Sequence, residues 1–139
     1  MIWPLKNTTA QLDHSALALD PFISLALKGQ EKAIESKNKA KTGQLIECYI
    51  YGAIRYIASY DDLNTENSKV LLHKMLSAHF DENDDEVNKS IKRLSEPQKG
   101  KTEQLFMIEG ASALRRYLVN GDRTVTTNLI ELLELHKTH

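Results

Sequence analysis

Residues 45–60, LIECYIYGAIRYIASY, constrain the fold of this chain more than any other stretch. Arranged as a helix, they are apolar or aromatic around most of the circumference, and a helix of this kind must be surrounded by other helices. The remaining sequence supplies amphipathic helical patterns and almost no strand pattern. We therefore predict an all-α fold, a single compact bundle of five to six helices with a buried central helix around residues 45–60.

One polar stripe interrupts this apolar helix. Its members recur at every fourth position and so lie along one side: Glu47, Tyr51, Arg55 and Ser59. The stripe can face solvent, satisfy polar groups of another helix such as Glu109 or Arg116, or contact a partner. Because tyrosine and arginine are enriched at binding hot spots, Tyr51 and Arg55 are candidate partner-binding residues.

The chain has 139 residues, enough for one core, and we expect a single all-helical domain over residues 1–139. Residues 1–19 are expected to form an irregular N-terminal segment. Asp20 and Pro21 predict a helix start, because aspartate caps exposed backbone amides and proline suits the first helical position. This helix is expected to run to about residue 39.

Start and stop signals divide the middle of the chain. An amphipathic helix is expected over about residues 65–80, with Val70 among the side chains of its inner face. Asn83 and Glu86 have the spacing of a capping box, which predicts the start of the next helix. Pro97 ends that helix, because the residue before a proline avoids helical geometry.

Two more helices are expected in the C-terminal part. The first begins with Thr102 as its cap and is closed by Gly121. Its interior sequence GASA, residues 110–113, lowers helix propensity, so we expect these small side chains to let a neighbouring helix come close. The last helix is expected over about residues 125–136, followed by a frayed tail at 137–139.

Cysteine usage and hydropathy bear on the location of the protein. Cys48 is the single cysteine and lies in the apolar helix, so no disulfide framework is expected and a reducing compartment is favoured. The N-terminus lacks the pattern of a signal peptide, and no run approaches the roughly 18 apolar residues that span a bilayer. We therefore expect a cytoplasmic protein with no membrane partner.

The charge distribution points to one acidic region. The net charge of −1 argues against a globally basic nucleic-acid binder, but residues 60–96 carry nine acidic against five basic side chains. We interpret this region as a candidate patch for a basic protein partner. Together with Tyr51 and Arg55, the candidate partner-binding residues are therefore the acidic side chains Asp61, Asp62, Glu66, Asp81, Glu82, Asp84, Asp85 and Glu86.

No metal, cofactor or catalytic motif is expected. Residues 81–86, DENDDE, resemble the start of a calcium loop, but Glu86 replaces the required glycine and Lys92 replaces the bidentate carboxylate. The five histidines lack the spacing of a metal site. The chain has no glycine-rich phosphate loop, nucleophile elbow or paired-carboxylate motif, so we do not expect an enzyme.

The leading functional hypothesis is a non-catalytic cytoplasmic protein-binding module. A narrower form is a small inhibitor of the immunity or antitoxin type that masks a basic surface of its partner, steered by charge.

Three alternatives remain open. The first is a small-ligand-binding or enzymatic bundle with Glu47, Arg55, Glu109 and Arg116 around a pocket. The second is weak nucleic-acid binding through Arg115, Arg116 and the lysines of the first helix. The third concerns assembly, since the leucine-rich C-terminal helix offers an apolar face for a homodimer.

Overall fold

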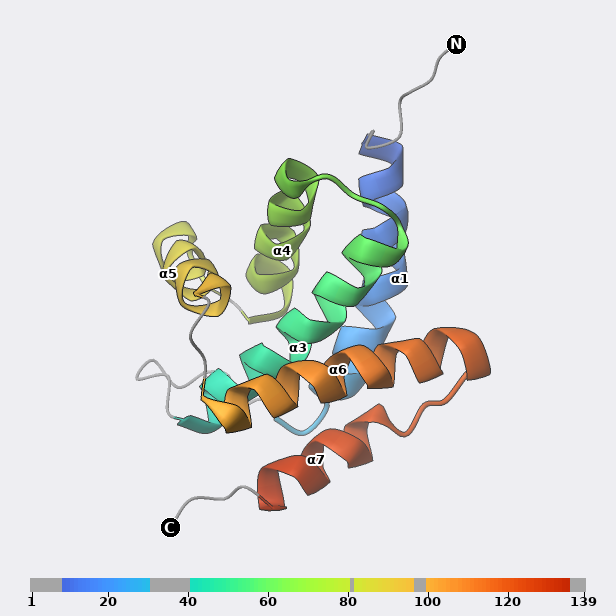
Figure 1. Cartoon of the computed structure of the whole chain (residues 1–139), viewed down its shortest axis with the longest axis vertical. Helices are drawn as coiled ribbons and strands as arrows, with labels where there is room; N and C mark the ends of the chain where they lie inside the picture. Colours follow the sequence, from blue (N-terminus) through green and yellow to red (C-terminus); the bar gives the residue numbers. More distant parts are fainter. Residues whose placement is uncertain (1–8, 31–40, 81, 97–99, 136–139) are drawn as a thin grey trace.

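The computed structural model describes residues 9–30, 41–80, 82–96 and 100–135, which form six helices and no strand (Figure 1). The predicted all-α class and the predicted number of helices are therefore confirmed. The helices are α1 (Thr9–Ala26), α3 (Lys41–Tyr60), α4 (Thr65–Phe80), α5 (Asp84–Ser95), α6 (Lys101–Asn120) and α7 (Val125–Leu135).

Helix α3 is the predicted central helix. It packs against α1, α4, α6 and α7, and Figure 1 shows α6 crossing it while α1 and α4 lie alongside. Ile46, Tyr49, Ile50 and Ala53 are completely buried within it. Apolar burial on several sides accounts for the stability of this helix, because each neighbour removes a different part of its surface from water.

The N-terminal prediction is wrong within the described residues. Helix α1 begins at Thr9, so residues 9–19 are helical instead of irregular, and Pro21 lies inside the helix instead of at its start. One apolar face continues across the proline, with Ala16 and Leu19 buried before it and Ile23 buried after it. Burial of this face outweighs the roughly 3 kcal/mol that a proline costs inside a helix.

The same helix is also shorter at its C-terminal end than expected. It ends at Ala26, and the turn that follows contains Gly29 with a φ of 86°, a left-handed conformation that suits glycine. The predicted continuation toward residue 39 falls largely in residues 31–40, which lie outside the described part. The predicted tail at 137–139 lies outside it as well.

The caps of the later helices follow the sequence closely. Asn83 and Glu86 form the predicted capping box, in which each backbone amide donates to the other residue's side chain at 2.9 and 3.0 Å. Gly121 closes α6 with a φ of 68°, also as predicted. Helix α6 begins one residue before Thr102, however, and its cap is Gly100, whose amide donates to the Glu103 carboxylate at 2.9 Å.

Helices α3 and α6 meet at a reciprocal glycine contact. A Cβ on Gly110 would lie 1.8 Å from the carbonyl oxygen of Tyr49, and a Cβ on Gly52 would lie 1.9 Å from that of Met107. Only glycine permits backbones to approach this closely. The predicted close approach at residues 110–113 is confirmed at Gly110, while its counterpart Gly52 was not anticipated.

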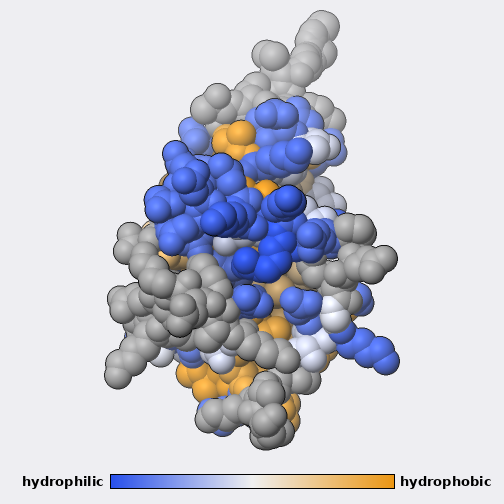
Figure 2. All heavy atoms as spheres, turned by 90° about the vertical axis from the view of Figure 1, so that its left-hand side faces the viewer, coloured by the Kyte–Doolittle hydropathy of each residue, from blue (hydrophilic) through white to orange (hydrophobic). Residues whose placement is uncertain are grey.

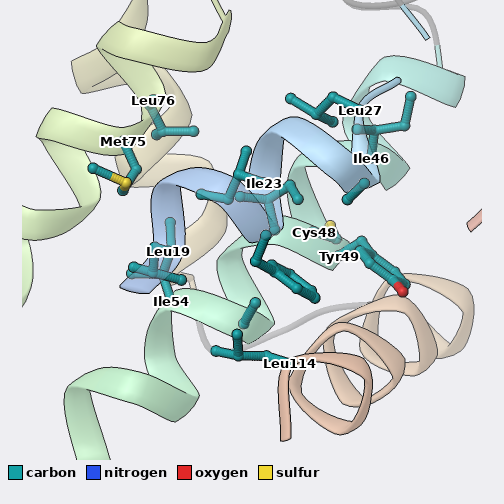
Figure 3. Close-up of a cluster of buried hydrophobic side chains, with 14 of the residues drawn as sticks. Leu19, Ile23, Leu27, Ile46, Cys48, Tyr49, Ile54, Met75, Leu76 and Leu114 are labelled. Atoms are coloured by element: carbon teal, nitrogen blue, oxygen red, sulfur yellow. The ribbon is translucent and has the colours of Figure 1, made fainter. Parts of the chain in front are cut away.

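The core joins side chains from all six helices, and Figure 3 shows part of it. This cluster includes Leu19 and Ile23 of α1, Ile54 of α3, Leu76 of α4 and Leu114 of α6. These side chains form a continuous apolar cluster, which fixes the relative positions of the helices that carry the candidate site.

The inner face of α4 differs from the expectation at one position. Val70 is 43% exposed, whereas Phe80 at the end of the helix is buried. Both are apolar, so composition does not separate them; Phe80 belongs to the hydrophobic core cluster and Val70 does not.

Candidate functional site

The polar stripe of α3 divides into a buried part and a surface part. Glu47 is completely buried, Tyr51 is half-buried, and Arg55 and Ser59 are exposed. The guanidinium carbon of Arg55 lies 5.7 Å from the centroid of the Tyr51 ring, within reach of a cation–π interaction. One stripe therefore serves two roles, an internal contact at one end and a surface site at the other.

The buried end of the stripe links α3 to α5. Glu47 forms an ion pair with Arg93, and the Ser90 hydroxyl lies 3.4 Å from its carboxylate. The same hydroxyl lies 3.3 Å from the carboxylate of Glu82, which is itself buried. For Glu47, the structure therefore shows one of the three alternatives, an internal partner on another helix, and this partner is Arg93 instead of Glu109 or Arg116.

Two residues of the alternative pocket, Glu47 and Arg116, have separate partners. Arg116 donates to the Ser112 hydroxyl at 2.8 Å and pairs with Asp122 at 3.4 Å, whereas Glu47 is held by α5. Hydrogen bonds from Thr124 lower the pKa of the Asp122 carboxyl, so Arg116 faces a charged partner at neutral pH. Neither Glu47 nor Arg116 lines the groove that Arg55 lines, which is described below.

The exposed end of the stripe lines a groove of about 340 Å³ between α3, α4 and the last residue of α5. Its floor is apolar and consists of Ile54, Ala58, Leu63 and Leu72. This volume lies at the lower end of the range for small-ligand pockets, and an apolar floor with polar groups above it is the usual composition of such sites.

The polar lining of the groove contains hydrogen-bond donors of two kinds. Two side chains are cationic, Arg55 of α3 and Lys69 of α4. Five others carry hydroxyl groups: Tyr51, Ser59, Thr65, Ser68 and Ser95. No carboxylate or imidazole is among the described residues that line it.

Part of the acidic region is engaged in structural contacts. Asp61 accepts hydrogen bonds from Ser15 through its carboxylate and from Gln11 through its carbonyl oxygen, both on α1. Glu82 contacts Ser90, and Glu86 belongs to the capping box. These three predicted site residues therefore have structural partners, while Asp81 lies outside the described residues.

Four predicted acidic residues remain exposed, in two groups. Asp62 lies in the turn before α4 and Glu66 in the first turn of α4, whereas Asp84 and Asp85 lie in the first turn of α5. The side chain of Asp84 is 86% exposed and lies 3.6 Å from His73. Figure 2 shows hydrophilic side chains gathered over the side of the molecule that α5 covers.

Other reactive groups have structural roles. Cys48 is buried in α3, and His79 lies 2.9 Å from Asp20, joining α4 to α1. Burial raises the pKa of the Tyr49 hydroxyl above its ordinary range, and this hydroxyl donates to Asn128 of α7 at 2.6 Å. No group of side chains suited to hold a metal ion occurs in the part of the chain that the structure describes.

Of the residues that line the groove, the sequence analysis named Tyr51 and Arg55 as candidates but not Lys69 or the apolar floor. Lys69 and Leu72 have the spacing of neighbours on one face of α4, which is the only signal that the sequence offers for them.

Among the described residues, no helix is long and apolar enough to cross a membrane. Comparison with known protein families, curated proteins and solved structures finds no match.

Proposed function

We propose that this chain is a non-catalytic protein-binding module and that the groove between α3 and α4 is its docking site. The observation that carries the proposal is the pairing of an apolar floor with a lining of hydrogen-bond donors around Tyr51 and Arg55. Grooves of this composition bury an apolar anchor and orient it with a few polar contacts.

The chemistry of the lining favours binding over catalysis. General acid–base catalysis needs a group that can take up a proton near neutral pH, such as an imidazole or a carboxylate. The described lining offers hydroxyl groups, a guanidinium and an ammonium group instead. These groups donate hydrogen bonds and attract negative charge, which suits recognition of an acidic group.

The anchor residues have the properties of a hot spot. Tyr51 is half-buried and stacks beside the Arg55 guanidinium, so both side chains are partly ordered before a partner arrives. Ordering that precedes binding lowers the entropic cost of association. Truncation of either side chain is therefore expected to weaken binding by more than about 1 kcal/mol, or roughly fivefold.

Affinity capture with matched variants tests this function. Tagged wild-type protein, Arg55→Ala and the control Lys89→Ala are compared as baits in extract of the native cell. Lys89 is an exposed cation of α5 outside the groove. We expect proteins that bind the wild type and the control but are depleted on the Arg55 variant; identical sets on all three baits would refute the assignment of the groove.

A second candidate function is inhibition of a partner with a basic surface. The observation that favours it is the exposure of Asp84 and Asp85 in the first turn of α5. If these carboxylates steer association, Asp84→Asn combined with Asp85→Asn should slow the association rate at low salt and have little effect at high salt. Unchanged association rates at low salt would remove this candidate.

A further inference from the structure

The groove presents unpartnered donors, and their number and charge restrict what can bind there. We infer that the groove binds a phosphorylated side chain of the partner protein, flanked by apolar residues. This inference rests on the proposed function, which makes the groove the docking site. It adds the chemical class of the group that the partner supplies.

The first argument concerns charge. Arg55 and Lys69 line the same groove from two different helices, and the described residues place no carboxylate within ion-pair distance of either. The contact of Arg55 with the Tyr51 ring leaves its N–H groups available. Two cations facing one small volume are complemented by a group that carries close to two negative charges.

The second argument concerns hydrogen bonding. The hydroxyl groups of Ser59, Thr65, Ser68 and Ser95 line the groove, and none of them has a hydrogen-bond partner among the described residues. A phosphate monoester carries about −1.5 to −2 charges near neutral pH and three strong acceptor oxygens. A carboxylate carries one charge and two oxygens, so it would leave more of these donors unmatched.

The third argument concerns the floor. Ile54, Ala58 and Leu72 form an apolar surface beneath the donors, and inorganic phosphate could not use it. A peptide segment covers this surface with the side chains on either side of its phosphorylated residue, and each buried CH₂ group contributes about 0.8 kcal/mol. The combination of floor and cations therefore fits a phosphopeptide better than a free anion.

A peptide titration tests the inference with purified full-length protein. The probe is a short blocked peptide with a phosphoserine between two leucines; the matched peptides carry serine or glutamate at the same position, and inorganic phosphate is titrated separately. We expect the phosphopeptide to bind most tightly, at least fivefold more tightly than the glutamate peptide. Its affinity should also rise between about pH 5 and pH 7, because the second pKa of the phosphate lies near 6.

Variants locate the binding site. Arg55→Gln and Lys69→Gln should each weaken phosphopeptide binding by about three- to tenfold, the range for charge-assisted hydrogen bonds that remain partly solvated. Lys89→Gln, which removes an exposed cation outside the groove, should leave the affinity unchanged. Far-UV circular dichroism of all three variants checks that they keep their helical content.

Three results would overturn the inference. They are equal affinity for the phosphorylated and unphosphorylated peptides, equal affinity for inorganic phosphate and the phosphopeptide, and phosphopeptide binding that Arg55→Gln and Lys69→Gln leave unchanged.

A phosphatase arm in the capture experiment separates the two proposals. If dephosphorylation of the extract removes the Arg55-dependent proteins, both proposals are supported. If these proteins persist after dephosphorylation, the docking function stands and the phosphate assignment falls.

Discussion

Replacement of the crossing glycines should destabilise the protein, although glycine-to-alanine substitution usually strengthens a helix. The proposed variants are Gly52→Ala and Gly110→Ala, each of which places a Cβ against a backbone carbonyl of the facing helix at 1.9 or 1.8 Å. Because the obstructing atoms belong to the backbone, rotation of a side chain cannot relieve either contact.

The magnitude follows from the distance that the helices must move. An ordinary Cβ contact begins near 3.4 Å, so α3 and α6 would have to separate by about 1.5 Å. Overpacking of a core costs about 1–3 kcal/mol, and a fixed backbone places the cost near the upper value. Alanine regains about 1 kcal/mol of helix propensity, which leaves a net loss of about 2 kcal/mol in the free energy of unfolding.

Urea unfolding monitored by far-UV circular dichroism measures this loss. With a denaturant slope of about 2 kcal/mol per molar, each variant should lower the urea midpoint by about 1 M. The double variant should lose less than the sum of the single variants, because separating the helices once relieves both contacts. Gly100→Ala is the matched control, since its Cβ would lie at 3.4 Å from a flexible glutamate side chain.

The reasoning would be refuted if Gly52→Ala or Gly110→Ala raised the urea midpoint. That is the expected result for an exposed helix position, where only propensity changes. A fall in the urea midpoint of Gly100→Ala as large as that of Gly52→Ala or Gly110→Ala would also contradict the reasoning.

Two further predictions concern buried polar groups. Arg93→Ala removes the ion pair to the buried Glu47 carboxylate and should lower the free energy of unfolding by about 3 kcal/mol, measured in urea. Arg93→Lys should retain part of this free energy. Burial raises the pKa of Tyr49 in the folded state, so above about pH 10 only the unfolded state releases this proton and stability falls as pH rises. Tyr49→Phe should lower the free energy of unfolding by about 1 kcal/mol at neutral pH, because the hydrogen bond to Asn128 is lost. It should also reduce the fall in stability above about pH 10. A urea midpoint that falls equally with pH in the variant and the wild type would contradict this assignment.

Local signals predicted much of this fold. The capping box at Asn83 and Glu86 and the left-handed closure at Gly121 are determined by residues close in sequence, and both occur as predicted. The central helix was predictable because its apolar circumference requires neighbours on most sides. Pro21 shows the limit of such signals, since burial of a face that spans both sides of the proline overrides its preference for a helix start.

The candidate site was predictable only in part. Helical spacing places Tyr51 and Arg55 on one side of α3, but spacing does not tell which helix faces that side. The groove needs Lys69 and Leu72 of α4 at a particular docking angle, and that angle is set by the packed core. The same limit explains why Arg93, and not Arg116, proved to be the partner of Glu47.

The contact between Asp61 and α1 has a consequence for binding. Asp61 follows α3 directly and accepts hydrogen bonds from Ser15 and Gln11 of α1. These bonds fix the start of the segment that brings Leu63 and Thr65 to the groove. If the groove binds a ligand as proposed, contacts that already hold this segment in place would lower the entropic cost of binding. Ser15→Ala removes one of these hydrogen bonds and is therefore expected to lower the affinity of the groove for its ligand, although Ser15 does not line the groove.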